Sequence, residues 1–421
     1  MSAGDSLLII GAGHAGAELA FAARQQGWAG SITLLGDEPA HPYHRPPLSK
    51  TQLAAGAGAE PGWIRPPETY AKLAIEFMPG VHVERIDREK HLVVLHDGRT
   101  LPYSKLALCT GGRPRLLDVE GLRGVAKPRK LHYLRTHEDA AAIRAQLTPG
   151  AKVIIIGGGY IGLEVAASAR KVHAAVTVLE AASRVLARVT GPQMSAFYQR
   201  VHEDAGVHIV TGAIVQRVTT DAAGAITSVI CADGTSHAAD LVLAGIGMLP
   251  NMELAADAGL DVAQGIVVDA SSTTSDPDIY AAGDCTVQHS ALYGRSIRLE
   301  SVPNALEQAR AAAAALCGNP RPNHAVPWFW SDQYDLKLQM AGLSDGHDTC
   351  VVRGSVTSRS LCAFYLKDGV LIAADAVNRP ADFMQCKRAL QDRVVVDAAA
   401  LADEAVQLKS LLTQQPAPAL S

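Results

Sequence analysis

Gly11-Ala-Gly-His-Ala-Gly16 and Gly157-Gly-Gly-Tyr-Ile-Gly162 are the stretches that decide the fold. Each follows an apolar, strand-like run, Leu7 to Ile10 in the first case and Val153 to Ile156 in the second, and each precedes a helix-like run. Glycines in such a loop let the backbone approach a pyrophosphate, and the following helix directs its positive end at the phosphates. One loop alone is a weak signal, but two predict two dinucleotide sites and a function that joins two nucleotides.

The residues after each loop complete a strand-helix-strand pattern. A helix to about Gln26 leads to a strand at Ser31 to Leu35, and a helix through Ala169 leads to a strand at Ala175 to Leu179. Such units build parallel sheets with right-handed crossovers. The fold class is therefore predicted to be α/β, with two Rossmann-like dinucleotide-binding domains.

The second domain is predicted to be inserted into the first. Strands at His91 to Leu95 and Leu101 to Cys109 flank the turn Asp97-Gly98, and residues 266–269 and 278–284 resemble a return to the first domain. The first domain then comprises residues 1–112 and 246–325, and the inserted domain residues 113–245.

The composition changes after about Val326. Trp328-Phe-Trp330 concentrates aromatic residues in a chain that is only 5% aromatic, and Asp368-Gly369 is a hairpin signal between apolar runs at 361–365 and 370–374. A helix at 381–394 follows, and we expect disorder after Leu412. Residues 326–421 are thus predicted to form a smaller α+β domain.

The composition limits the classes of function that the chain could have. With 421 residues, of which 48% are hydrophobic, the chain can bury several cores, and its net charge of -4 argues against a nucleic-acid partner. No membrane segment is recognisable, so we expect a cytoplasmic protein. The seven cysteines form no close pair and the 15 histidines lack the spacing of a metal site, so no metal is expected.

Acidic residues after the loops help to assign the nucleotides. Glu180 stands 23 residues after Gly157 at the end of a strand, where a carboxylate can accept hydrogen bonds from ribose hydroxyls and would repel a 2′-phosphate. This favours NADH over NADPH, although Arg184 and Arg188 nearby could weaken the preference. In the first unit Asp37 could reach the ribose or could simply form part of a turn.

Several longer motifs extend this pattern over the whole chain. In order, they are Gly36-Asp-Glu, Pro46-Pro-Leu-Ser-Lys50, Thr110-Gly-Gly-Arg-Pro114, Gly157 to Glu164, Ala282-Gly-Asp284, Glu300 to Ala309 and Trp328 to Tyr334. Together they resemble the FAD-dependent ferredoxin reductases. The resemblance implies a glutathione-reductase-like flavoprotein with FAD in the first site, NADH in the second and the C-terminal domain beside the flavin. It also implies a 2Fe-2S ferredoxin partner that serves a bacterial heme-thiolate monooxygenase, and we expect a monomer or weak dimer.

The same resemblance assigns site residues. The implied FAD contacts are Gly11, Gly13, His14, Ala15, Gly16, Asp37, Arg45, Lys50, Val83, Thr110, Gly111, Arg135, Asp284, Val302 and Trp330. The implied NADH contacts are Gly157, Gly159, Tyr160, Ile161, Gly162, Glu164, Glu180, Arg188 and Gly247. Lys50 and Glu164 are the candidate catalytic pair that tunes the flavin. Arg310, Lys387 and Lys409 match the docking face, and Arg388 is a further basic candidate.

Ordinary structural roles remain open for several of these residues when each is considered alone. Asp284 could be a turn residue, Val302 extended backbone, Tyr160 and Trp330 core aromatics, and each basic residue a solvated charge. Two other functions also remain open: a related flavoprotein that reduces rubredoxin, a quinone or a thiol, and an NADH-sensing interaction protein resembling the apoptosis-inducing flavoproteins. The thiol version is disfavoured because residues 39–50 contain no cysteine to attack a disulfide.

Overall fold

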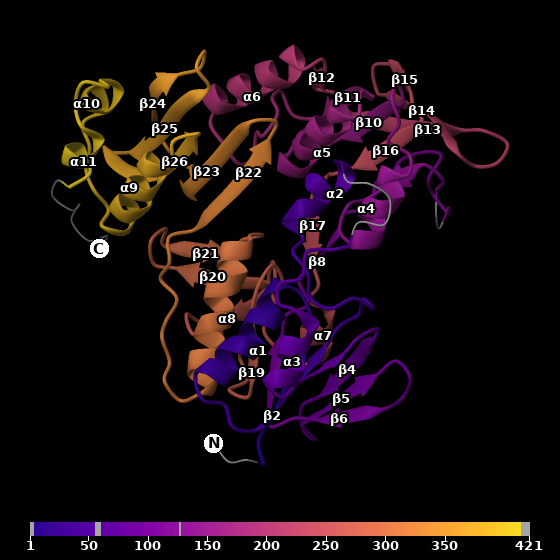
Figure 1. The fold of residues 1–421 in the computed structure, drawn as a ribbon, viewed down its shortest axis with the longest axis vertical. Helices are drawn as coiled ribbons and strands as arrows, with labels where there is room; N and C mark the ends of the chain where they lie inside the picture. Colours follow the sequence, from indigo (N-terminus) through magenta and orange to yellow (C-terminus); the bar gives the residue numbers. More distant parts are fainter. Residues whose placement is uncertain (1–3, 55–59, 126–127, 414–421) are drawn as a thin grey trace. The chain divides into compact units, whose positions relative to one another are not determined.

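The computed structural model describes residues 4–54, 60–125 and 128–413 (Figure 1). The chain divides into two compact units, the first comprising Met1–His44, Pro61–Arg113 and Met248–Pro327, and the second Arg45–Glu60, Pro114–Gly247 and Trp328–Ser421. The disorder expected after Leu412 concerns residues that, from 414 on, lie outside the described ones. The four-segment division at residues 112, 245 and 325 stays a prediction.

A five-stranded parallel sheet is the centre of the first unit. Its strand order is β19-β7-β1-β2-β3, formed by Ile279–Ala281, Lys105–Leu108, Ser6–Ile10, Ser31–Leu35 and Ile75–Met78. Strand β1 is a continuous apolar run because both faces of the sheet are covered: Leu7 and Ile9 belong to one buried cluster, and Leu8 and Ile10 to another. Of the residues predicted to return to the first domain, Ala281 pairs with Leu108 at the edge of this sheet, whereas residues 266–268 join a separate sheet.

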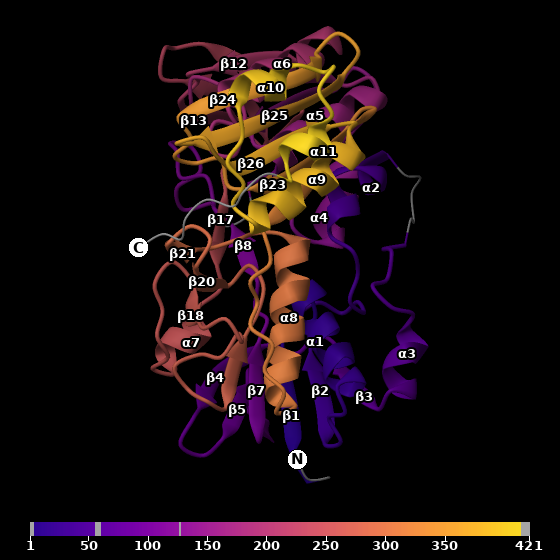
Figure 2. The same ribbon diagram turned by 90° about the vertical axis from the view of Figure 1, so that its left-hand side faces the viewer.

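Two helices cover one face of the sheet. Helix α1 (His14–Gln25) and helix α8 (Val302–Leu316) lie side by side in both ribbon views (Figures 1 and 2). Buried alanines, including Ala20 and Ala309, fill the cluster that contains both helices, and small side chains allow close helix packing. The close approach keeps the first residues of α8 near the loop that precedes α1.

The predicted strand at Leu101 to Cys109 is wrong as a single element. Strand β6 (Thr100–Pro102) continues the antiparallel sheet of β4 (Val83–Asp87) and β5 (Leu92–Leu95), whereas β7 joins the parallel sheet. The chain changes sheets just after Pro102, which has no backbone N–H to extend the ladder. The next residue but one, Ser104, donates its backbone N–H to Ser6 O at 3.0 Å, at the start of β1.

Smaller elements complete the first unit. A three-stranded sheet has the order β18-β20-β21, with parallel pairing of β18 and β20 and antiparallel pairing of β20 and β21. These strands and the remaining short elements are β18 (Ile266–Val268), β20 (Thr286–Ser290), β21 (Arg295–Ile297), β17 (Met248–Pro250), α3 (Pro67–Lys72) and α7 (Glu253–Asp257). The chain leaves this unit along β8 (Gly112–Pro114).

The second unit contains the second parallel sheet, of order β12-β11-β10-β16-β9. Its strands are His208–Thr211, Ala175–Glu180, Lys152–Ile156, Leu241–Ala244 and Leu131–His132. The antiparallel strands β13 (Val215–Thr220) and β14 (Ile226–Cys231) share a buried cluster with Ile154 and Ile156, and β15 (Ser236–Ala238) pairs with β14. The associated helices are η1 (Pro46–Ser49), α2 (Thr51–Ala54), α4 (His137–Arg144), α5 (Tyr160–Lys171) and α6 (Pro192–Asp204).

The C-terminal part of the second unit is an antiparallel sheet with helices, as predicted. Its strand order is β22-β23-β26-β25-β24, formed by Trp328–Gln333, Leu336–Gly342, Val370–Val377, Ser360–Lys367 and Thr349–Ser355. Helices α9 (Pro380–Gln391), α10 (Ala398–Ala402) and α11 (Leu408–Leu411) follow. The predicted hairpin is confirmed: Lys367 pairs with Val370, and both residues between them have positive φ, 51° at Asp368 and 76° at Gly369, which suits a type I′ turn.

A buried acid links this sheet to the loop before α6. The Asp375 carboxylate, 3% exposed, accepts hydrogen bonds from the hydroxyls of Thr190 and Tyr365, and the Tyr365 hydroxyl also accepts the Gly191 N–H at 3.0 Å. Burial raises the pKa of Asp375 to about 6, although the hydrogen bonds from Thr190 and Tyr365 oppose that rise.

This acid should make stability depend on pH. Because its folded pKa lies above the ordinary value of 3.8, the protonated form stabilises the fold at low pH, and that contribution, roughly 3 kcal/mol, is lost as pH rises through 6. We expect Asp375→Asn to raise Tm relative to the wild type at pH 8 and to lose this advantage near pH 4. Thermal unfolding of both holoproteins across this range checks it, and a pH-independent difference in Tm would contradict it.

Candidate functional site

The first glycine loop leaves open space in front of helix α1. Gly11 has φ of 108°, and a Cβ there would lie 2.1 Å from Cys109 O, so the backbone can pass only as glycine. A Cβ on Gly13, in contrast, would meet nothing within 4 Å. Gly13 is the N-cap of α1, and no side chain caps the helix. The first backbone N–H groups of α1 therefore border a free space, as an anion site requires.

The second loop repeats this geometry in the second unit. Gly157 has φ of 107°, and a Cβ there would lie 2.4 Å from Gly245 O. Gly159, the N-cap of α5, again has open space beside it and no capping side chain. Ile161, in the first turn of α5, is 44% exposed, which is unusual for a large apolar side chain. Both loops thus fit a dinucleotide pyrophosphate.

Glu180 is fixed against the second loop. Its Oε2 accepts the Gly158 N–H at 2.6 Å and its Oε1 accepts the Ala182 N–H at 2.7 Å. The carboxylate at the end of β11 is therefore oriented before any ligand binds, and its remaining lone pairs can accept ribose hydroxyls.

The two arginines that could weaken a preference for NADH have different environments. Arg184 donates to the carbonyls of Thr190 and Ala187, both at 2.9 Å, and so holds its own loop together. Arg188 is exposed, and its guanidinium nitrogens lie 3.9 Å from the position of a Cβ on Gly247. Of the two, Arg188 is the one available to a ligand.

The remaining first-unit candidates surround the ends of the parallel strands. Thr110 donates its hydroxyl to Asn251 O at 2.6 Å, and the Asn251 side chain donates back to Thr110 O at 2.9 Å, which fixes the Thr110-Gly111 segment. Asp37 is 78% exposed and lies 3.2 Å from His82 Nδ1. Val83 is only 6% exposed and belongs to an apolar cluster, so its side chain packs in the core.

The residue before Asp284, Gly283, lies close to two helices. A Cβ on Gly283 would lie 3.2 Å from the Ala15 Cβ and 3.7 Å from the Ala305 Cβ, so this segment passes between the first turns of α1 and α8. Gln308 holds it by accepting the Gly283 N–H at 2.9 Å. The structure therefore brings Asp284 and Val302, the first residue of α8, to the same end of the unit as the first loop.

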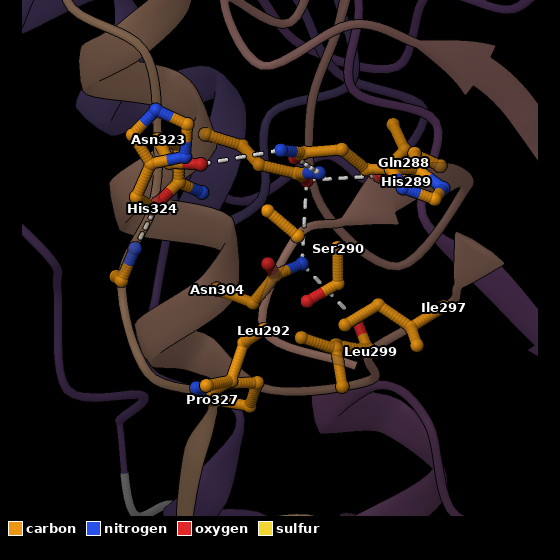
Figure 3. Close-up of a pocket in the computed structure, with 14 residues that line it drawn as sticks. Gln288, His289, Ser290, Leu292, Ile297, Leu299, Asn304, Asn323, His324 and Pro327 are labelled. Atoms are coloured by element: carbon orange, nitrogen blue, oxygen red, sulfur yellow. Dashed lines mark hydrogen bonds between the residues drawn. The ribbon is translucent and has the colours of Figure 1, made fainter. Parts of the chain in front are cut away.

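Polar residues next to this segment form hydrogen bonds with one another. The pocket in Figure 3 is lined by Gln288, Asn304, Asn323 and others. Gln288 donates to Asn323 O at 3.3 Å, and Gln308 donates to the Gln288 side chain at 3.3 Å. These hydrogen bonds hold the Gln308 side chain, which in turn accepts the Gly283 N–H.

A buried ion pair lies in the second unit. Lys50 Nζ is 2.7 Å from Glu164 Oε2, and the two side chains are 18% and 1% exposed. Glu164 Oε2 also accepts the Ser49 hydroxyl at 2.5 Å, and Oε1 accepts the Ser331 hydroxyl at 2.6 Å. Three segments of the sequence, η1, α5 and β22, thus meet at one carboxylate, and only the Lys50–Glu164 pair was predicted from the sequence.

Helix α5 holds the segment of Lys50 with two side chains one turn apart. Glu164 accepts from the Ser49 hydroxyl, and Ser168 donates its hydroxyl to Ser49 O at 2.8 Å. Residues four apart share one helix face, so both bonds reach the same short segment. Ser49 and Ser331 both lie inside motifs that carry the family resemblance, and their positions in those motifs are the signal that could have identified them.

Some of the other predicted residues of the second unit contact one another. Arg45 donates to Arg135 O at 2.7 Å, so these two are neighbours. The Tyr160 hydroxyl donates to Met340 Sδ, and its ring lies 5.2 Å from that of Phe329. Trp330 is half-buried between aromatic neighbours. The centre of its ring lies 5.7 Å from that of Trp328 and 6.1 Å from that of Phe329.

The basic candidates differ in how their charges are paired. Arg310 contacts two carboxylates, Glu18 at 2.7 Å and Glu307 at 3.4 Å. The Lys387 ammonium lies 5.0 Å from the centre of the Trp328 ring, as in a cation-π contact. Arg388 on α9 and Lys409 on α11 are exposed.

Within residues 4–54, 60–125 and 128–413, no helix has the length and apolarity needed to cross a bilayer. In the same ranges, no group of three or more His, Cys, Asp and Glu side chains could hold a metal ion.

Comparison with known proteins identifies the family. The sequence model of the pyridine nucleotide-disulphide oxidoreductases matches residues 5–309, and that of the reductase C-terminal domain matches residues 328–412. The chain is 50% identical to putidaredoxin reductase of Pseudomonas putida, over 98% of each protein. It is 43% identical to a ferredoxin–NAD(P)+ reductase of a Sphingomonas species, over 98% of each.

Solved structures agree. The reductase in the crystal structure of the covalent putidaredoxin reductase–putidaredoxin complex superposes with a TM-score of 0.94 at 50% identity, covering 98% of this chain and 99% of that one. The glutathione-reductase-like architecture with two Rossmann-like regions and a C-terminal domain is thereby confirmed, as are FAD and NAD(P)H as cofactors. The chain belongs to the pyridine nucleotide-disulphide oxidoreductase family, as an FAD-dependent ferredoxin reductase.

Proposed function

We propose that this reductase uses NADH in preference to NADPH and passes electrons through FAD to a 2Fe-2S ferredoxin that serves a bacterial heme-thiolate monooxygenase. The observation that carries the nucleotide assignment is the Glu180 carboxylate, held by two backbone N–H groups beside the open Gly159 space. A fixed negative charge at the end of β11 suits ribose hydroxyls and opposes a 2′-phosphate. The identity of 50% to putidaredoxin reductase supports the acceptor.

The residues of this chain bind and orient the cofactors. FAD, when bound, supplies the chemistry of accepting a hydride and releasing electrons singly. The uncapped first turns of α1 and α5 would hold the two pyrophosphates, and Thr110, Gly111, Asp284 and Val302 would complete the flavin half of the first site. Lys50 and Glu164 would lie beside the reacting rings as a pair without net charge, held by Ser49 and Ser331.

Basic and apolar groups on α9 and α11 support a ferredoxin docking surface. Lys387 and Arg388 are accompanied by Met384, which is 62% exposed, and Lys409 lies on α11, which packs next to α9 (Figure 2). Ferredoxins of the proposed type are acidic, so a local basic surface would aid encounter with a chain whose net charge is -4. In the first unit, Arg310 is the proposed docking residue.

We also propose a cytoplasmic location and a monomer or weak dimer. All seven cysteines are free thiols, and five of them have exposures of 6% or less in the buried core: Cys109, Cys231, Cys285, Cys362 and Cys386. Free thiols suit a reducing compartment.

Replacing Glu180 should change the nucleotide preference. Glu180→Gln removes the charge but keeps one acceptor oxygen for the loop, so we expect the ratio of kcat/KM for NADH over NADPH to fall about tenfold, or about 1.4 kcal/mol. Arg188→Gln should act in the opposite direction by lowering kcat/KM for NADPH more than for NADH. Steady-state kinetics with both nucleotides test this, and equal kcat/KM values in the wild type would refute the preference.

Removing the Lys50 charge should make the flavin harder to reduce. Lys50→Met leaves the buried Glu164 carboxylate without its countercharge, so the flavin potential should fall and reduction by NADH should slow by roughly tenfold. The double variant Lys50→Met/Glu164→Gln removes both charges and should recover much of the potential. Stopped-flow reduction and redox titration measure both, with FAD content as the control. Unchanged values in Lys50→Met would disprove this role.

Reversing the charge of Arg310 should weaken ferredoxin docking. Arg310→Glu would create a cluster with Glu18 and Glu307, so the KM for putidaredoxin in NADH-driven cytochrome c reduction should rise at least about tenfold, or about 1.4 kcal/mol if KM follows binding. The matched control is Arg99→Glu. Arg99 is likewise exposed and paired with a carboxylate, that of Asp97, but it lies after the hairpin turn that follows β5. Raised salt should weaken ferredoxin reduction while FAD reduction by NADH changes little. An unchanged KM for putidaredoxin at low salt would exclude Arg310 from the docking surface.

A further inference from the structure

A line of buried polar side chains ends on the Glu164 carboxylate. Ser331, Gln333 and His202 are 0%, 1% and 0% exposed. Ser331 Oγ donates to Glu164 Oε1 at 2.6 Å, and Gln333 Nε2 donates to Ser331 Oγ at 3.0 Å. Gln333 Oε1 lies 2.8 Å from His202 Nε2, and His202 Nδ1 lies 3.1 Å from the Tyr334 hydroxyl. We call the four residues Tyr334, His202, Gln333 and Ser331 the donor chain.

The direction of every bond follows from the chemistry of the groups. The Gln333 oxygen can only accept, so His202 Nε2 carries the proton. Burial lowers the pKa of His202 to about 4, so at neutral pH its Nδ1 is an acceptor. Burial also raises the pKa of Tyr334 to about 12, so its hydroxyl retains the proton and donates. From Tyr334 to Glu164, all four bonds therefore donate toward the carboxylate.

An unfavourable backbone conformation accompanies this arrangement. Tyr334 has φ of 56°, and a bulky aromatic residue rarely adopts positive φ. It occupies the first of two residues between the paired Gln333 and Leu336, a turn position that glycine or asparagine would fill without strain. The Tyr334 ring lies 5.0 Å from that of His202. Strained residues of this kind persist where the surroundings hold them, and they cluster at functional sites.

We propose that the donor chain is a positioning network for the reductase reaction, which orients Glu164 and keeps it as the negative partner of Lys50. The inference rests on the proposed role of the Lys50–Glu164 pair. Hydrogen bonds that donate in one direction polarise one another, so the Ser331 bond to Glu164 is strengthened by the groups behind it. Without a fixed Ser331 hydroxyl, Glu164 Oε1 would lose the only donor that the described residues give it. A buried anion that lacks a donor is costly and moves or becomes neutral.

The decisive variants change direction and charge while preserving shape. Gln333→Glu introduces an acceptor where the chain needs a donor, so the Ser331 hydroxyl should turn away from Glu164 toward the introduced carboxylate. We expect stopped-flow reduction of the FAD holoprotein by NADH to slow at least about tenfold and the flavin potential to shift from the wild-type value. Ser331→Ala should slow reduction similarly. His202→Gln retains an N–H donor to Gln333, so reduction should stay within about twofold of the wild type.

A matched control separates positioning from packing. Ser195 on α6 is 1% exposed and donates its hydroxyl to Val185 O at 2.6 Å, so Ser195→Ala deletes an equally buried hydroxyl that is outside the donor chain. It should leave the flavin potential unchanged. If Ser331→Ala and Gln333→Glu alter Tm as Ser195→Ala does but leave the potential and the reduction rate at wild-type values, the donor chain is only structural and the inference is wrong.

A double-mutant cycle distinguishes this inference from the role on which it rests. In a Glu164→Gln background, Ser331→Ala should slow reduction by less than about twofold, because its effect acts through the carboxylate. Full additivity of the two substitutions would overturn the network while leaving the role of Glu164 intact. If Glu164→Gln alone changes neither the reduction rate nor the potential, the proposed role of the pair fails, and the network loses its purpose with it.

Discussion

A buried carboxylate is costly unless donors reach its oxygens, and in the second unit that constraint connects segments far apart in the sequence. Glu164 takes Lys50 and Ser49 on one oxygen and Ser331 on the other. Replacing any one partner would leave a desolvated charge, which is more costly than losing an ordinary surface ion pair. The position of η1 against α5, and of β22 against the same helix, is therefore tied to the charge state of one side chain.

The dinucleotide loops depend on a different constraint, the room available to a backbone. Gly11 and Gly157 have nearly equal φ values of 108° and 107°, and in each case a carbonyl of a neighbouring strand end occupies the place of a Cβ. The blocking carbonyls, Cys109 O and Gly245 O, follow strands that are distant in the sequence, but each glycine loop with its own strand and helix belongs to one local βαβ unit. Its sequence signature is therefore short and strong, and both loops, their strands and their helices could be predicted from the sequence.

Long-range pairing explains where prediction failed. The Asp368-Gly369 hairpin was predictable because its turn residues set their own geometry, whereas the run from Leu101 to Cys109 looks like one strand and belongs to two sheets. Nothing local marks the change except Pro102, and the pairing partners Val93 and Leu8 lie elsewhere in the chain. Among site residues, Lys50 and Glu164 could be predicted through the family resemblance. Ser331 was not predicted although it lies in one of the motifs that carry the resemblance, and His202 could not be predicted because a buried histidine has no distinctive spacing.

Polar burial in this unit has two energetic outcomes that geometry separates. Among the described residues, Asp375 accepts from two hydroxyls, those of Thr190 and Tyr365, and its burial raises the pKa to about 6, so near neutrality its charge opposes folding. Glu164 instead has a cation at 2.7 Å and hydroxyl donors on both oxygens, one of them backed by the donor chain. A protein tolerates the first arrangement as a cost to stability. The second holds a paired carboxylate in a fixed orientation, which is the property that a site must have to influence a bound redox cofactor.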